Sequence, residues 1–113
     1  MFFVDEAYLE YQDNPKAESM IDLVNKGLNI TILRTFSKVY GMAGIRMGYA
    51  VSSKDMIEKL KSTTRSHQSL TVTALSGAYE AFQETEFLYS IKKKTSESRE
   101  YLYSILRKEG YEY

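Results

Sequence analysis

The sequence predicts an α/β fold in which strand-helix units occupy the first half of the chain and long helices the second. Short unbroken apolar runs recur early, as in strands of a parallel sheet that is covered on both faces. A segment with helix start and end signals separates the first two runs, and from residue 72 onward apolar residues recur at three- and four-residue steps. The 113 residues suffice for one compact domain with a modest core.

The strand-helix units lie within the first 51 residues. The first strand is predicted at residues 2–4, where the apolar run ends at charged residues. A helix follows from Asn14-Pro15, an N-cap with proline at the first helical position, to Gly27, a common helix terminator. The apolar residues 30–33 and 48–51 predict a second and a third strand.

The second half is predicted to be helical. Ser52-x-x-Asp55 resembles a capping box that opens a helix. Two apolar stripes predict two further helices, which are separated near Thr85, and we interpret both stripes as core. The first stripe consists of Val72, Leu75, Tyr79 and Phe82, and the second of Phe87, Leu88, Ile91, Leu102, Ile105 and Leu106. We therefore divide the chain into a strand-helix segment, 1–68, and a helical segment, 69–113.

Composition excludes several classes of function. Fifteen basic residues balance fifteen acidic ones, so no net field favours nucleic acid or an acidic membrane. Cysteine is absent and His67 is the only histidine, so no metal site of the cysteine or multi-histidine kind is expected, and His67 itself is expected to be a surface or core residue. No apolar run approaches the roughly 20 residues that cross a bilayer, and no secretory signal is recognisable. We expect a cytoplasmic protein.

Lys38 is the first candidate for chemistry. It follows the strand at 30–33 in a loop flanked by glycines, and a lysine at a strand end can form a Schiff base. Desolvation and a nearby cation, which Arg46 could supply, would lower the pKa of the amine and make it a nucleophile. The alternative is a solvated surface charge, the usual state of a loop lysine.

Asp5 is the second candidate. It stands at the carboxyl end of the first strand, where open α/β sheets bind their ligands, so the two strand ends could share one crevice. A carboxylate there could keep the ring nitrogen of a pyridine cofactor protonated. The alternative is an aspartate that caps a turn.

Three ordered motifs carry a family resemblance. Asp5-Glu6-Ala7-Tyr8, Thr35-Phe36-Ser37-Lys38 and residues 43–49 (Ala-Gly-Ile-Arg-Met-Gly-Tyr) resemble the signature of class I/II pyridoxal-phosphate aminotransferases, most closely in the histidinol-phosphate aminotransferase branch. The resemblance implies the large domain of fold type I, with parallel strands, one reversed strand and long helices leading toward the small domain.

The resemblance also implies roles for individual residues around pyridoxal 5'-phosphate. Lys38 would form the imine with the cofactor and later transfer the proton, Asp5 would pair with the pyridinium nitrogen, and Tyr8 would hydrogen-bond the phenolic oxygen. The cofactor phosphate would be held by Thr35, Ser37 and Arg46. Packing for Tyr8 and loop capping for Thr35 and Ser37 remain alternatives, and Glu6 is given no role.

The resemblance covers residues 2–51, and it implies an internal piece of a longer enzyme, because members of the family are longer than this chain. The first strand supports the same expectation, since it reads as a central one with nothing ahead of it. The family's substrate-binding arginine and part of its phosphate site are not recognised here. We expect an aminotransferase that moves an amino group from an amino acid or an amino-alcohol phosphate, such as histidinol phosphate, to a 2-oxo acid, with this piece inactive alone. It would form a homodimer or self-associate. Alternatives are a non-catalytic cofactor-binding or association module, and a decarboxylase or lyase of the same fold.

Overall fold

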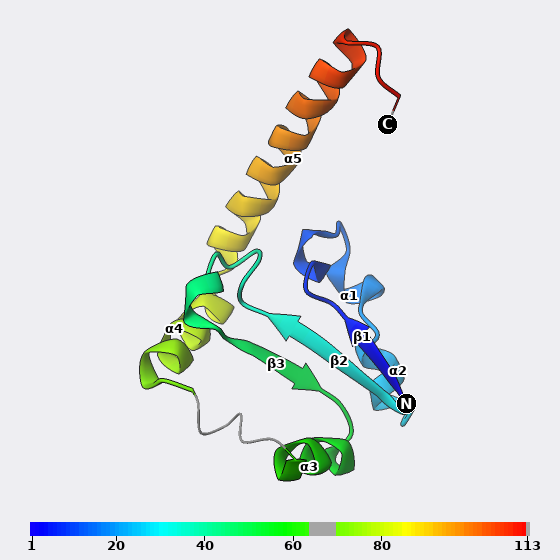
Figure 1. Ribbon diagram of the computed structural model, residues 1–113, viewed down its shortest axis with the longest axis vertical. Coiled ribbons are helices and arrows are strands. Elements are labelled where there is room, and N and C mark those ends of the chain that lie inside the picture. The colour runs from blue at the N-terminus through cyan, green and yellow to red at the C-terminus, as the bar shows by residue number, and fades with distance from the viewer. Residues whose placement is uncertain (64–69, 113) are drawn as a thin grey trace. The chain divides into compact units, whose positions relative to one another are not determined.

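The computed structural model of the chain describes residues 1–63 and 70–112 (Figure 1). Its strands are β1 (Phe2–Asp5), β2 (Ile30–Thr35) and β3 (Gly48–Val51). Its α-helices are α1 (Pro15–Glu18), α2 (Ile21–Asn25), α3 (Lys54–Thr63), α4 (Val72–Gln83) and α5 (Thr85–Lys108), and two 3-10 helices span Leu9–Tyr11 and Ala43–Ile45. The chain forms two compact units, Met1–Gln83 and Glu84–Tyr113. The boundary predicted after residue 68 falls among residues that the structure does not describe, as does His67.

The sheet confirms the predicted fold class. Its strands lie in the order β1-β2-β3, with β1 parallel to β2 and β3 antiparallel to β2. The central strand carries the core, because Ile30, Thr31 and Ile32 are all buried. The first strand, which reads as a central one, has β2 as its only partner among the described residues, so β1 is an edge strand and Phe2 is 72% exposed.

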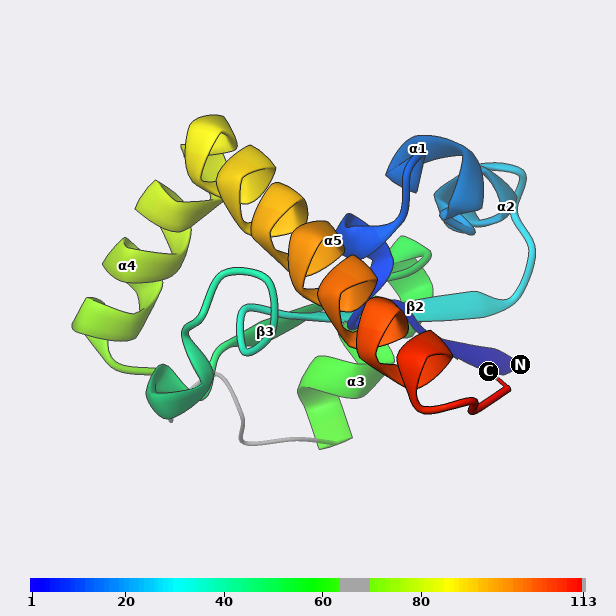
Figure 2. The ribbon, with the colours of Figure 1, turned by 90° about the horizontal axis from the view of Figure 1, so that it is seen from above.

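The helix predicted between the first two strands is instead two short helices, which lie on one side of the sheet (Figure 2). Asn14 caps α1 as predicted, accepting a hydrogen bond from the Ala17 backbone nitrogen at 3.3 Å. The helix breaks at Ser19, whose backbone is extended (φ −75°, ψ 139°). At this break Ser19 and the Met20 backbone nitrogen bind the Glu6 carboxylate, a long-range contact that local sequence signals do not contain.

The start of α3 corrects a second detail. Ser53, not Ser52, caps this helix, since its hydroxyl accepts a hydrogen bond from the Met56 backbone nitrogen at 3.4 Å. Ser52 belongs to the sheet: its hydroxyl donates to the Ile30 carbonyl at 2.7 Å and accepts from the Thr31 hydroxyl at 3.0 Å.

The two long helices form where the periodicity predicts them, but their apolar stripes are not core. In α4 the buried residues are Ala74 and Ala78, whereas Leu75 and Tyr79 are exposed. Small side chains let α4 approach the rest of its unit closely, and a Cβ added at Gly77 would lie 3.0 Å from the Met42 methyl carbon. No residue of α5 is buried. Among the described residues, no helix is both long and apolar enough to cross a membrane.

Candidate functional site

The ends of all three strands bring the predicted site residues to one edge of the sheet. The parallel pairing of β1 and β2 aligns Asp5 with Leu33, so both strands end on the same side. The antiparallel pairing of β3 aligns Gly48 with Thr35, so β3 begins where β2 ends. The two strand ends therefore lie at the same edge of the sheet, and that they share one crevice stays a prediction; the reversed strand adds the segment that carries Arg46.

Lys38 and Tyr8 are the two predicted residues that lie together. The Lys38 Nζ atom is 5.2 Å from the centroid of the Tyr8 ring, a cation-π contact between the loops that follow β2 and β1. Both side chains are exposed. The desolvation expected for Lys38 is therefore not provided by the described part of the chain.

Buried aromatic residues hold the loop that carries Lys38. Phe36 and Tyr40 are 5% and 8% exposed, and their ring centroids are 4.9 Å apart. Val39, between them, is also buried. Burial raises the pKa of Tyr40 to about 12, and the carboxylate of Glu10 adds to the effect. Lys38 is thus an exposed residue in a loop whose buried residues Phe36, Val39 and Tyr40 hold it to the rest of its unit.

Asp5 forms a local turn at the end of β1. Its Oδ1 atom accepts a hydrogen bond from the Ala7 backbone nitrogen at 2.9 Å, and the side chain is exposed. This contact fits the alternative role of a turn aspartate. It engages Oδ1 and orients the carboxylate at the edge where Lys38 lies.

Thr35 links β2 to the segment before β3. Its hydroxyl donates to the Met47 carbonyl at 3.3 Å and accepts from the Ser37 backbone nitrogen at 3.0 Å. Thr35 and Ser37 are both half-buried. These contacts fit the loop-capping alternative.

Arg46 has an unusual backbone conformation. It is the only described non-glycine residue with positive φ, at 54°, and it ends the 3-10 helix Ala43–Ile45. Its Nη1 atom donates to the Ala43 carbonyl at 3.0 Å, and the side chain is exposed. A left-handed backbone costs a residue with a Cβ roughly 1–2 kcal/mol, and such strain tends to occur at functional sites.

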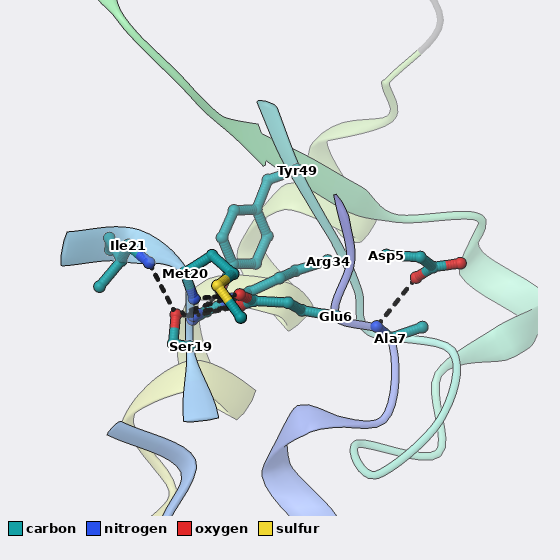
Figure 3. Close-up of polar contacts among 8 residues, drawn as sticks. All are labelled: Asp5, Glu6, Ala7, Ser19, Met20, Ile21, Arg34 and Tyr49. Carbon is teal, nitrogen blue, oxygen red and sulfur yellow. Dashed lines mark hydrogen bonds and ion pairs between the residues drawn. The ribbon is translucent and has the colours of Figure 1, made fainter. Parts of the chain in front are cut away.

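An ion pair between a half-buried arginine and a buried glutamate next to this edge was missed by sequence reasoning. Glu6 is 6% exposed, and its Oε2 atom accepts hydrogen bonds from Arg34 Nε at 3.0 Å and Nη2 at 2.8 Å (Figure 3). Burial alone would lower the pKa of the Arg34 guanidinium, but hydrogen bonds to Tyr49 and Glu6 outweigh burial and raise it. The available signal was a second carboxylate directly after Asp5 and an arginine directly before Thr35.

Comparisons with known proteins agree with the motifs. The family model for aminotransferase class I and II matches residues 1–113. A histidinol-phosphate aminotransferase from Caldicellulosiruptor saccharolyticus is 36% identical over 88% of this chain, and an aromatic amino acid aminotransferase from Mycolicibacterium vanbaalenii is 35% identical over 99% of it.

Structural similarity supports the same assignment. The crystal structure of histidinol-phosphate aminotransferase from Sinorhizobium meliloti, in complex with pyridoxal-5'-phosphate, superposes on 96% of this chain with a TM-score of 0.83 and 29% sequence identity. The chain spans only 28%, 32% and 29% of the lengths of these three proteins. With a family match over its whole length and the strand arrangement of a solved relative, the chain belongs to the class I and II aminotransferases.

Proposed function

We propose that this chain forms the lysine-bearing wall of a pyridoxal 5'-phosphate site in an aminotransferase. The observation that carries the proposal is the position of Lys38, whose amine lies 5.2 Å from the Tyr8 ring at the edge where β1 and β2 both end. Two loops from neighbouring strands thus present an amine and a phenol to one place. An amine, a phenol and a carboxylate at one sheet edge are the groups that a pyridine aldehyde requires.

The donor set fits the cofactor. Asp5 offers a carboxylate for the ring nitrogen, and Arg46 offers a guanidinium that can hold a phosphate through two parallel hydrogen bonds. The hydroxyls of Thr35 and Ser37 lie between these positions along the chain and would complete the phosphate contacts. When bound, the cofactor supplies an electron-withdrawing pyridine ring.

Each protein group then has a defined task. The Lys38 amine would hold the cofactor covalently and afterwards move a proton at Nζ, which requires the amine in its uncharged form. The Tyr8 hydroxyl would donate a hydrogen bond to the phenolic oxygen of the cofactor. Asp5 would keep the ring nitrogen protonated, and the Ala7 backbone would fix the orientation of its carboxylate.

The substrate side of the proposal rests on the relatives. Their names include histidinol-phosphate and aromatic amino acid aminotransferases, so the proposed donors are histidinol phosphate or an aromatic amino acid, with a 2-oxo acid as acceptor. We also propose a homodimer and a cytoplasmic location. Because the chain spans about a third or less of these relatives, the proposal assigns it cofactor binding but no turnover alone.

A titration of the chain with pyridoxal 5'-phosphate, followed by absorbance, tests cofactor binding. We expect saturable binding that is lost in Lys38→Ala and weakened in Asp5→Ala. Lys59→Ala is the matched control, because Lys59 is an exposed lysine on α3, which follows the end of β3 opposite to the one that pairs with Thr35. Equal absorbance changes in Lys38→Ala and the unmodified chain would refute the proposal.

A further inference from the structure

The carboxylate of Glu6 is surrounded by donors from two other parts of the chain. Oε1 accepts a hydrogen bond from the Met20 backbone nitrogen at 2.7 Å, and Oε2 accepts two from Arg34. The Ser19 hydroxyl lies 3.2 Å and 3.1 Å from the two carboxylate oxygens and donates to them. A buried carboxylate with this many donors is fully satisfied and rigidly oriented.

Ser19 and Arg34 complete the network. The Ser19 hydroxyl accepts hydrogen bonds from Arg34 Nη2 at 2.9 Å and from the Ile21 backbone nitrogen at 3.2 Å, so its donor and both lone pairs are used. Arg34 Nη1 reaches the Tyr49 hydroxyl at 3.4 Å. The network therefore connects β1, β2, β3 and the break between α1 and α2.

The network lies on the face of the sheet opposite the proposed cofactor residues. Successive side chains of a strand point to opposite faces, so Glu6 points away from Asp5, and Arg34 away from Thr35. Figure 3 shows Asp5 and Glu6 directed to opposite sides of the strand end, with Glu6 among Ser19, Met20 and Arg34. Glu6 is buried, Ser19 and Arg34 are half-buried, and their polar side-chain atoms are engaged with one another.

We infer that Glu6 and Arg34 are positioning residues that fix the separation of the Asp5–Tyr8 and Thr35–Lys38 segments. Glu6 lies two residues before Tyr8, and Arg34 lies four residues before Lys38, so the ion pair joins the bases of both loops. The backbone extends this connection, because the Glu6 nitrogen donates to the Leu33 carbonyl at 2.9 Å. The inference rests on the proposed function for its purpose, but its geometry can be tested without cofactor.

The test uses the contact between Lys38 and Tyr8 to report the separation of the two loops. An aromatic ring shifts the NMR signals of protons above it, so the Lys38 side-chain protons report how close the two loops lie. Tyr8→Leu sets the unshifted reference. We expect a ring-induced shift in the unmodified chain, loss of most of it in Glu6→Gln, and an intermediate value in Arg34→Lys.

The chemistry of the two variants explains this order. Glutamine keeps an acceptor for the Met20 nitrogen but presents an uncharged amide to Arg34, so the two-donor contact is lost. Lysine keeps the positive charge but cannot reach Glu6, Ser19 and Tyr49 at once as the guanidinium does. A Lys38 shift in Arg34→Lys that is larger than in Glu6→Gln but smaller than in the unmodified chain therefore distinguishes positioning by charge from simple packing.

Glu58→Gln is the matched control. It removes the same charge from an ion pair, with Lys61 at 3.1 Å, but both of these side chains are about 60% exposed and lie on α3. We expect no change in the Lys38 shift in this control. All variants are compared at a temperature where far-ultraviolet circular dichroism reports equal secondary structure.

Two results would overturn the inference. One is an unchanged Lys38 shift in folded Glu6→Gln, which would leave the ion pair with only a stabilising role. The other is an unmodified chain without any shift relative to Tyr8→Leu. If the shift behaves as expected but pyridoxal 5'-phosphate does not bind, the proposed function fails while the positioning role stands.

Discussion

At the scale of single residues, the substitution Arg46→Gly allows the cost of backbone strain to be measured separately from the contribution of the side chain to ligand binding. Its φ of 54° favours glycine, and Arg46→Gly would relieve roughly 1–2 kcal/mol of strain. Greater entropy of the unfolded chain offsets about 0.4–1 kcal/mol of that gain. We therefore expect the free energy of unfolding to rise by roughly 0–1.6 kcal/mol, as measured by urea denaturation.

The same variant removes the guanidinium proposed to hold the cofactor phosphate. A hydrogen bond to a charged group contributes about 1.5–3 kcal/mol, so the Kd for pyridoxal 5'-phosphate should rise about 10- to 100-fold. Pyridoxal, which lacks the phosphate, is the control ligand and should bind both proteins equally. Equal loss of both ligands would contradict the phosphate role.

Tyr40 gives a prediction about pH. Its pKa is raised from 10.0 to about 12 in the folded chain, so above pH 10 the unfolded chain loses this proton first. The stability due to Tyr40 is complete below pH 10 and is lost as the pH rises toward 12, by on the order of 2 kcal/mol. Tyr40→Phe should lose less stability than the unmodified chain over this interval, and parallel curves would contradict the prediction.

Residue types identified part of the site from the sequence. Asp5 is the last residue of β1 and Lys38 lies three residues beyond β2, so their position at the sheet edge could be predicted from local pattern. Glu6 could not be assigned, because its role depends on Arg34, which lies 28 residues further along the chain. Which of two adjacent carboxylates is buried is decided by partners in three dimensions.

At the scale of secondary-structure elements, Gly48 limits the approach of β3 to β2. A Cβ added there would lie 2.8 Å from the Arg34 carbonyl oxygen, so Gly48→Ala must move the backbone of the paired strands. We expect a loss of about 1–3 kcal/mol in the free energy of unfolding. Thermal and urea unfolding measure this loss.

Gly44 is the matched control. An added Cβ there meets no atom of the described residues within 4 Å, and its φ lies outside the positive region, so Gly44→Ala should change stability by less than about 0.5 kcal/mol. Equal destabilisation by both variants would contradict the close approach of the strands.

The strands and long helices were predictable because each depends on its own sequence pattern. The break between α1 and α2 was not, because it follows from the contacts of Ser19 and Met20 with Glu6. The exposed stripe of α4 was also not predictable, since periodicity identifies an apolar face but not what covers it. Ala74 and Ala78 are buried because small residues fit closely spaced elements.

At the scale of the whole molecule, exposed apolar side chains predict self-association. Phe2 and Val72 are 72% and 80% exposed, and β1 offers an edge to another strand. Light scattering should give masses above 13.1 kDa that rise with concentration, and Phe2→Lys should lower them. Glu112→Lys, a change of charge beyond the last helix, is the control. A constant mass of 13.1 kDa would contradict this prediction.

The central claim is that the three strand ends form one wall of a pyridoxal 5'-phosphate site with Lys38 as the covalent partner. Borohydride reduction of the cofactor-loaded chain, followed by peptide mass mapping, tests it most directly, because reduction fixes the cofactor to the lysine that holds it. We expect one modified lysine, Lys38, with labelling reduced in Asp5→Ala and Arg46→Gly. Labelling spread over many lysines, or confined to a lysine other than Lys38, would contradict it.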